Sequence, residues 1–388
     1  MTGPTPARSL PPGHRLAMPK EQRHMFQHRA LRNVSDDVPI HVSMDRTLRV
    51  KVIDACGMTC TFCHNEGTPV SADNHPRWPE RFTPTGPSGR TSLYAATNGA
   101  RFTSAPVIPD EAFRGALTQL RDALDFDEVH LTGGEPTLHP KLPQIVALAR
   151  QAGYSASVTS NGENGVRSLS GCVDAGLRHV NFSIFGTTPD ELAQVQSTRF
   201  RVRALAARKI EALEDSIRVA VSLGIGVRAN VVIPDHTHVQ RVHRLLEKYS
   251  PRLSVRILTS LADGDASLDA VDLLLAELGA VPQEVRLIAG TSGFRITYQL
   301  PSGRQLVVKH IRSLRLPDTC TGCRFNNSVD CHEGYYGVRL YRDPDGTFHV
   351  GVCIQRMDLC LPVEEFVDSD ACTEIRKMRE QDLHDLTA

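Results

Sequence analysis

The sequence predicts an α/β fold in which a parallel sheet curves into a full or partial barrel. Short segments rich in β-branched and apolar residues predict strands, and the patterns of the stretches between them predict helices. Alternation of strand and helix over six strands is typical of a parallel sheet. No G-x-G-x-x-G motif follows the first strand, which disfavours an open dinucleotide-binding sheet. The expected strands are 48–54, 128–134, 155–162, 179–186, 226–234 and 253–260.

Two of the expected helices are marked by their ends. Asp110 is the expected N-cap of a helix in which five apolar side chains recur on one face. Another helix is expected from about residue 209 to residue 223, where Gly224 would end it. The five apolar side chains after Asp110 are Phe113, Ala116, Leu117, Leu120 and Leu124.

Composition narrows the class of protein. The 44 basic residues balance the 44 acidic ones, so bulk charge predicts neither a nucleic-acid partner nor a membrane partner. No apolar run approaches the about 20 residues that span a bilayer, and no signal peptide is recognisable. We therefore expect a cytoplasmic protein. Thiols in that compartment are kept reduced, so the ten cysteines indicate metal binding or redox chemistry.

Three of these cysteines lie in one loop directly after the first expected strand. Cys56, Cys60 and Cys63 follow the spacing Cys-x3-Cys-x2-Cys. A closed zinc site takes four ligands, whereas a four-iron cluster held by three thiolates keeps one iron open to a small molecule. The loop is expected at the carboxyl edge of the sheet, where α/β barrels place their active sites. The spacing alone also allows a zinc knuckle that takes its fourth ligand from elsewhere, such as His64.

A second motif decides between these interpretations. Phe62 precedes the third cysteine, and "LTGGEPTLHP" (131–140) follows the second expected strand. Together the two motifs resemble those of the radical S-adenosylmethionine (SAM) superfamily. The resemblance implies a partial (β/α)6 barrel and a 4Fe-4S cluster on Cys56, Cys60 and Cys63 that binds SAM. The SAM contacts expected from this resemblance are Phe62, Gly133, Gly134, Glu135, Ser160, Asn161 and Ser183.

The resemblance also implies the chemistry. SAM would be cleaved reductively to a 5′-deoxyadenosyl radical that abstracts hydrogen from a substrate, after an electron arrives from a donor such as flavodoxin or ferredoxin. Physically, glycines without a Cβ permit close approach of a ligand, and a glutamate can accept a hydrogen bond from an ammonium group. Hydroxyl side chains at strand ends also serve as helix caps, so Ser160 and Ser183 could be caps instead of SAM contacts.

Within the superfamily, residues 46–360 resemble the GTP 3′,8-cyclase of molybdenum-cofactor biosynthesis. Three differences favour another, specialised small-molecule substrate such as a nucleoside, a sugar or a metabolite. His130 stands where the cyclase has an arginine, Arg339 is the nearest counterpart of an arginine run, and the chain ends "HDLTA" without a diglycine. The expected substrate contacts are Arg49, His130, Thr159, Arg228 and Arg339. The cyclase itself, a peptide-modifying radical SAM enzyme, and an iron–sulfur or zinc protein without catalysis remain alternatives.

Six further cysteines follow residue 319. Cys320, Cys323, Cys331 and Cys353 could hold a second 4Fe-4S cluster or a structural zinc, and Cys360 or Cys372 could replace Cys331. Cys172 is expected to be an inert core residue. The expected organisation is a disordered arm (1–45), a barrel (46–265) with a long loop insertion (69–107), and a C-terminal region for the auxiliary cluster (266–388).

Overall fold

Six parallel strands form the middle of one continuous sheet. The computed structural model describes residues 15–18, 28–32, 34–327 and 329–387. Each of the six strands pairs in parallel with the next along the chain, as the sequence predicts. The strands are β3 (Thr47–Ile53), β4 (Glu128–Gly133), β5 (Ser155–Ser160), β6 (His179–Ser183), β7 (Gly226–Ile233) and β8 (Leu253–Thr259). The predicted α/β partial barrel is confirmed.

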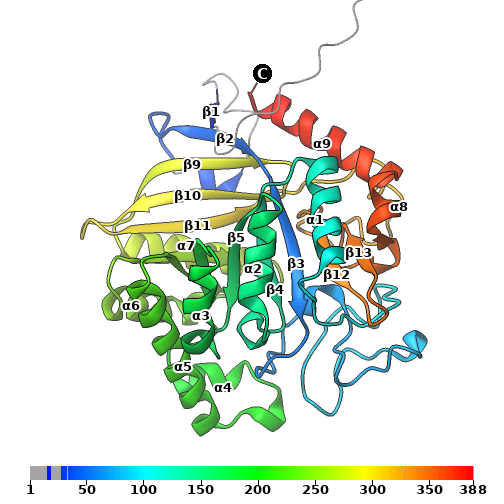
Figure 1. Ribbon diagram of the computed structural model, residues 1–388. Helices are drawn as coiled ribbons and strands as arrows, with labels where there is room; N and C mark the ends of the chain where they lie inside the picture. The colour runs from blue at the N-terminus through cyan, green and yellow to red at the C-terminus, as the bar shows by residue number, and fades with distance from the viewer. Residues whose placement is uncertain (1–14, 19–27, 33, 328, 388) are drawn as a thin grey trace, which may run out of the picture.

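Further strands extend this sheet at both edges, and most come from beyond residue 265 (Figure 1). Beside β8 lie β11 (Gln305–Ile311), β10 (Gly293–Gln299) and β9 (Val281–Ala289), and then β2 (Ile40–Met44) and β1 (Leu16–Ala17). Beside β3 lie β12 (Arg339–Arg342), β13 (Phe348–Gly351) and β14 (Leu361–Pro362). Strand β2 falls within the expected disordered arm, but five of its residues pair with β9. Most of the rest of that arm lies outside the described residues.

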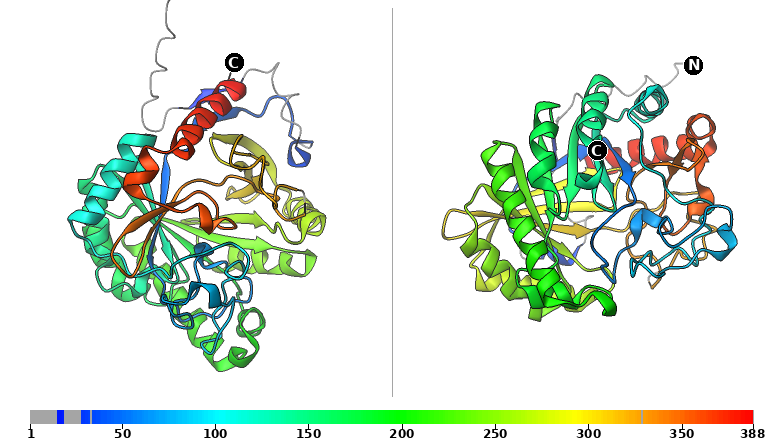
Figure 2. Two further views of the ribbon diagram at one scale, coloured as in Figure 1. Left: turned by 90° about the vertical axis from the view of Figure 1, so that its right-hand side faces the viewer. Right: turned by 60° about the horizontal axis from the view of Figure 1, so that its bottom comes forward.

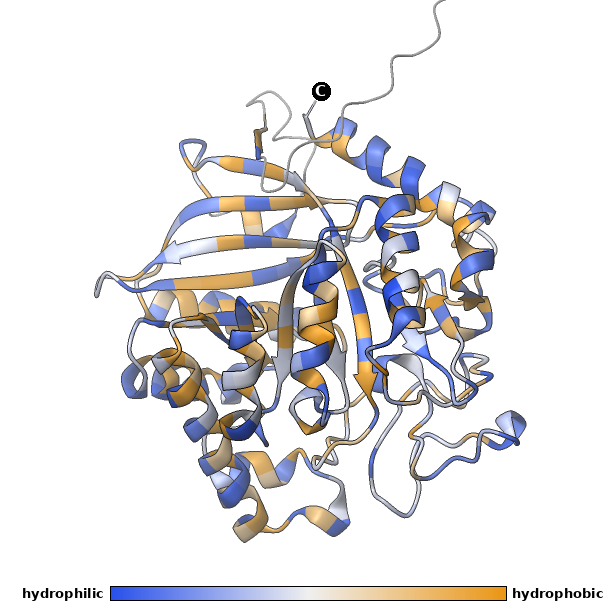
Figure 3. Ribbon diagram, in the orientation of Figure 1, coloured by the Kyte–Doolittle hydropathy of each residue, from blue (hydrophilic) through white to orange (hydrophobic). Residues whose placement is uncertain are grey.

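Helices cover the outer face of the curved sheet (Figure 2). Along the strands, buried apolar residues that face the helices alternate with polar residues on the other face, which Figure 3 shows as alternating colours. The covering helices are α1 (Glu111–Leu124), α2 (Leu142–Gln151), α3 (Gly165–Asp174), α5 (Arg203–Ser222), α6 (Val239–Lys248) and α7 (Gly264–Glu277), while the short α4 (Pro189–Gln194) packs against α5. None of the helices in the described ranges is long and apolar enough to cross a membrane.

The two helix ends marked in the sequence are present. Asp110 caps α1 by accepting a hydrogen bond from Phe113 N at 3.0 Å. Gly224 follows α5 with a positive φ of 72°, which suits a residue without a Cβ. Helix α5 begins at Arg203, earlier than expected. The prediction missed its first turns because they carry arginines and alanines and show little apolar periodicity.

The last helix closes the barrel at the end where the strands begin. Helix α8 (Val363–Val367) packs against α1, and α9 (Asp370–Thr387) lies against β2 and β9. Arg379 of α9 donates hydrogen bonds to the carbonyl oxygens of Leu124 and Asp45. The carboxyl end of the sheet, by contrast, carries the three-cysteine loop.

Candidate functional site

The loop after β3 is anchored by a buried ion pair. Lys51 Nζ lies 2.8 Å from Asp54 Oδ1, and both side chains are almost fully buried. Arg90, from the long 69–107 connection, donates to the other carboxylate oxygen of Asp54 at 2.9 Å. Lys51 also donates to Asn65 O at 3.0 Å and to the hydroxyl of Thr68. These contacts fix both ends of the three-cysteine loop.

The three thiols of this loop lie among hydrogen-bond donors. Cys56 Sγ and Cys63 Sγ each accept a bond from the backbone N–H two residues later, at 3.4 and 3.3 Å. The side-chain amides of Asn161 and Gln196 donate to Cys56 Sγ at 3.6 Å and to Cys60 Sγ at 3.7 Å. Burial raises the pKa of Cys56 and Cys60 to about 12, so ligation has to compensate their deprotonation. N–H donors around sulfur suit thiolates that bind iron.

Side chains far along the chain hold this loop in place, and sequence reasoning missed them. Glu163 accepts a bond from Gly57 N at 2.9 Å, and Lys209 donates to Gly57 O. Gln196 accepts from Thr59 N at 2.8 Å, in addition to its contact with Cys60. No motif marks these residues, because their role depends on α5, the segment before it and the turn after β5 lying against the loop.

The glycine pair at the end of β4 permits close contact within the protein. A Cβ on Gly134 would lie 2.2 Å from Asp54 O and 2.4 Å from Ala55 O. A Cβ on Gly133, whose φ is +155°, would lie 2.3 Å from Ile53 O. We expected this space to admit a ligand, but the backbone that leads into the three-cysteine loop occupies it.

Glu135, Ser160 and Asn161 form one buried group beside the loop. Glu135 Oε1 accepts bonds from the hydroxyls of Ser160 at 2.7 Å and Thr137 at 2.6 Å. Its other oxygen accepts a bond from Asn161 N at 2.6 Å. Burial raises the pKa of Glu135, while these bonds favour the carboxylate. The carboxylate thus joins the end of β4 to the end of β5.

Two other expected SAM contacts lie near the same edge. The ring of Phe62 is 44% exposed and lies 5.2 Å, centroid to centroid, from that of Phe185. Ser183 is half-buried at the end of β6. The exposed face of Phe62 therefore remains available to a ligand.

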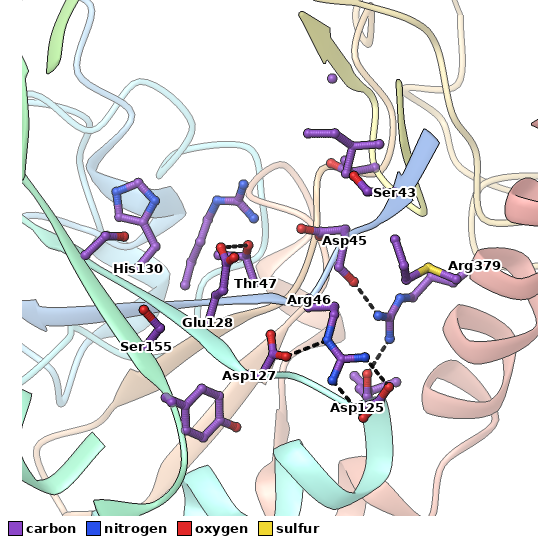
Figure 4. Close-up of a pocket in the computed structure, with 18 of the residues that line it drawn as sticks. Ser43, Asp45, Arg46, Thr47, Asp125, Asp127, Glu128, His130, Ser155 and Arg379 are labelled. Atoms are coloured by element: carbon purple, nitrogen blue, oxygen red, sulfur yellow. Dashed lines mark hydrogen bonds and ion pairs between the residues drawn. The ribbon is translucent and has the colours of Figure 1, made fainter. Parts of the chain in front are cut away.

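A cavity of about 1030 Å³ occupies the inside of the barrel. Polar residues from β3 to β8 line it, in contrast to the apolar interior of a filled barrel. Figure 4 shows the part around Glu128, His130 and Thr47. The polar lining from these strands comprises Thr47, Arg49, Glu128, His130, Ser155, Ser157, His179, Asn181, Arg228 and Arg256.

Five half-buried cations line this cavity with no carboxylate of the described residues within ion-pair distance. They are Arg49, Arg228, Arg256, Arg295 and Lys309. Among the residues that the structure describes, none of the five takes part in an ion pair, whereas many other arginines do. Burial and the like charges of Arg295 and Arg228 lower the pKa of Arg256. Such a group of half-buried cations favours an anionic ligand.

Tyr336 lies within this cationic group. Lys309 Nζ donates to Tyr336 Oη at 2.7 Å, and the Arg49 guanidinium stacks 4.0 Å from the ring centroid. Burial favours the neutral phenol, but the charges of Lys309 and Arg49 lower the pKa of Tyr336 to about 7. A phenol in this position can exchange a proton near neutral pH. No sequence pattern pointed to this residue.

The expected substrate residues divide into two groups. Arg49, His130 and Arg228 line the cavity, and His130 Nε2 lies 2.6 Å from the hydroxyl of Thr159. Burial, together with the charge of Arg49, lowers the pKa of His130 to about 3. His130 is therefore neutral and adds no charge to the site. Arg339 instead forms an ion pair outside the cavity lining.

Arg339 of β12 contacts the three-cysteine loop. Its Nε donates to Glu66 Oε2 at 3.0 Å, and the nearby Tyr341 hydroxyl donates to Glu66 O at 2.7 Å. Asn65 and Glu66 both have positive φ, of 48° and 55°, which non-glycine residues seldom adopt. The ion pair therefore holds an unusual backbone turn and joins the loop to the C-terminal strands.

Four C-terminal cysteines line a second, smaller cavity of about 30 Å³. They are Cys320, Cys323, Cys331 and Cys353. Cys360 lies outside it, with its Sγ 3.8 Å from Met357 Sδ, and Cys372 is buried in α9. Within the described ranges, no group of three or more His, Cys, Asp or Glu side chains is arranged to hold a single metal ion. Cys172 is buried in α3.

The long 69–107 connection lies between the two cysteine sets. Asn98 Nδ2 donates to Gly67 O at 2.7 Å and to Ile354 O at 2.8 Å, and so contacts the segments that follow Cys63 and Cys353. Ala105 N donates to Arg342 O at 2.7 Å. This connection is therefore part of the wall between the sets.

A partial parallel barrel with three cysteines in one loop at its carboxyl edge is typical of a class of iron–sulfur enzyme. Residues 50–249, just over half of the chain, match the model of the Radical SAM superfamily. The chain therefore belongs to the radical SAM superfamily and is an enzyme of that class. SAM and a 4Fe-4S cluster are its cofactors.

Two known proteins with similar sequences are named as GTP 3′,8-cyclases. A probable GTP 3′,8-cyclase of Metallosphaera sedula is 26% identical over 328 residues, which cover 81% of this chain and 86% of the relative. A GTP 3′,8-cyclase of Klebsiella pneumoniae is 27% identical over 225 residues, which cover 57% of this chain and 56% of the relative.

Solved structures are more distant. The structure of a tagged anSMEcpe with bound AdoMet aligns over 87% of this chain and 83% of its own, with a TM-score of 0.45 and 11% identity. Streptococcus suis SuiB aligns over 62% of this chain and 48% of its own, with a TM-score of 0.38 and 13% identity. The alignment thus spans about half the length of SuiB.

The contact at Gly134 predicts a stability difference between two glycine substitutions. Gly134→Ala should lower the free energy of unfolding by about 1 to 3 kcal/mol or more, because the Cβ would overlap fixed backbone oxygens. Gly115→Ala, in α1 with no atom within 4 Å of its Cβ, should raise it by about 0.5 to 1 kcal/mol. Urea unfolding measures both, and equal stabilities would contradict the packing role of Gly134.

Proposed function

We propose that this radical SAM enzyme acts on a small anionic metabolite, such as a phosphorylated nucleoside or sugar, bound inside the barrel. The observation that carries this proposal is the group of five half-buried cations around the cavity, none of which forms a close ion pair among the described residues, although Glu128 and Asp45 also line the cavity. When bound, the cluster and SAM supply a 5′-deoxyadenosyl radical that abstracts hydrogen. The polar lining of the barrel would orient the substrate, and the 69–107 connection would help to exclude water.

The geometry of the loop supports a set of proposed cofactor contacts. Cys56, Cys60 and Cys63 would bind the cluster, with Asn161 and Gln196 donating to their sulfurs. Phe62 and Ser183 would contact SAM directly. Gly133 and Gly134 would act by packing, and Glu135 by holding the ends of β4 and β5 beside the cofactor.

The GTP 3′,8-cyclase reaction is the second candidate, because the curated relatives carry that name. Against it, two of the expected guanidinium contacts are lost. His130 is neutral, and Arg339 is paired with Glu66 rather than lining the barrel. A triphosphate needs several charge-assisted contacts, so the loss of these two favours a smaller anion.

We further propose that Cys320, Cys323, Cys331 and Cys353 hold a second 4Fe-4S cluster. Their shared lining of one small cavity favours this set over Cys360 or Cys372. Four thiolates would close that cluster, so it would support the fold or carry electrons rather than bind substrate. A zinc ion is the alternative occupant.

The first expected outcome concerns SAM cleavage. Anaerobically reconstituted protein should form 5′-deoxyadenosine with dithionite, because the loop supplies three thiols to the cluster. Replacing Cys56, Cys60 and Cys63 by alanine should abolish the product and leave part of the iron. Cys172→Ala, a buried cysteine in α3, serves as the control and should keep the product. If the triple variant still made 5′-deoxyadenosine, the loop assignment would be wrong.

Metal content distinguishes the occupants of the second cavity. Two cubane clusters require about eight irons per chain, whereas one cluster with a zinc ion gives about four irons and one zinc. Elemental analysis of anaerobic protein should show about eight irons per chain. The Cys331→Ala variant should contain less iron than wild type, and the Cys360→Ala variant should contain the same amount. Stoichiometric zinc would refute the second cluster.

The reaction with GTP separates the two candidate substrates. Loss of one buried charge-assisted contact costs about 1.5 to 3 kcal/mol, so the reduced enzyme should turn GTP over at least about tenfold more slowly than an authentic cyclase assayed in parallel. Mass spectrometry of the 3′,8-cyclised product makes the comparison. Equal turnover by the two enzymes would favour the cyclase instead.

A further inference from the structure

A row of basic side chains lies on the surface beside the three-cysteine loop. Residues 195–209 contain five basic residues and no acidic one. The four arginines of this row are exposed, and Lys209 is half-buried. We call this set the basic row. It consists of Arg199, Arg201, Arg203, Arg208 and Lys209.

The position of this row is unfavourable for the helix that carries part of it. Arg203 is the first residue of α5, whose first turn has no acidic residue and no side-chain cap. The N-terminus of a helix carries partial positive charge, so cations there destabilise it. Helix stability therefore does not account for the basic row.

Nearby carboxylates neutralise only part of this charge. Arg203 pairs with Asp190 at 3.1 Å, and both side chains are largely exposed, so the pair is weak. Lys209 lies 3.5 Å from Glu163. Neither Arg199 nor Arg208 has a carboxylate partner within the described part of the chain. The row therefore presents net positive charge to solvent.

The basic row is joined directly to the loop of the cluster. Ser197 N donates to Thr59 O at 2.8 Å, and Thr61 N donates to Val195 O at 3.0 Å. Lys209 donates to Gly57 O. Lys209 and the segment that carries the first arginines of the row thus contact the backbone of the three-cysteine loop directly. Because electron transfer slows steeply with distance, this is a short path from solvent to the cluster.

We propose that the basic row is the docking surface for an acidic electron-carrier protein of the flavodoxin or ferredoxin class. The inference rests on the proposed function, since it assumes a cluster on Cys56, Cys60 and Cys63. The carrier's reduced flavin or iron–sulfur group loses one electron, and the cluster gains it. Complementary charge steers such an encounter and raises its rate.

The experiment compares two ways of reducing the same enzyme. Formation of 5′-deoxyadenosine from SAM is measured with dithionite, and separately with increasing concentrations of a flavodoxin that NADPH and flavodoxin reductase keep reduced. In the variant Arg199→Glu/Arg208→Glu, the KM for flavodoxin should rise about tenfold or more, because like charges now meet. The dithionite-driven rate should stay within about twofold of wild type.

A matched control reverses two exposed arginines at the other end of the barrel. Arg218→Glu/Arg252→Glu changes net charge by the same amount and should keep the wild-type KM for flavodoxin. An unchanged KM in Arg199→Glu/Arg208→Glu, or an equal rise in both variants, would overturn the docking surface alone. A lost dithionite-driven rate only in Arg199→Glu/Arg208→Glu would assign the row a structural role instead. Absence of product from wild type with dithionite would overturn the proposed function as well.

Discussion

The buried contact between Lys51 and Asp54 is the constraint on which the site depends. Burial alone would raise the pKa of Asp54, but Lys51 and Arg90 hold it well below its usual range. A buried ion pair is stable only when its other hydrogen bonds are satisfied, and here those bonds reach residues on both sides of the three cysteines. This ion pair thus connects the end of β3, the three-cysteine loop and the long 69–107 connection.

The barrel provides the second constraint, through the alternation of its strands. Their outward residues pack against the helices, which leaves polar and cationic residues inside. Half-buried cations without a close ion pair are costly, and an anionic substrate would offset that cost. Arg49 and Tyr336 lie in this interior, while Arg339 and Glu66 join the cysteine loop to the C-terminal strands. The same strands would therefore position both the cluster loop and the substrate.

Sequence reasoning recovered the parts of the molecule that local pattern determines. The six strands, the cap at Asp110 and the loop cysteines follow from periodicity and spacing. Gln196, Glu163 and Tyr336 could not be found in this way, because each acts through a contact with a segment distant along the chain. The same applies to Arg339, whose pairing with Glu66 depends on β12 adding to the edge at β3. The packing role of the glycine pair could not be predicted either, because it depends on which backbone segment lies against these glycines in the fold.

The central claim is that the cluster on Cys56, Cys60 and Cys63 has one iron open to SAM. Electron paramagnetic resonance of the dithionite-reduced protein, recorded with and without SAM, tests it most directly. We expect SAM to change the spectrum of wild type and to have no effect in a variant in which all three cysteines are alanine. Identical spectra of wild type with and without SAM would contradict it.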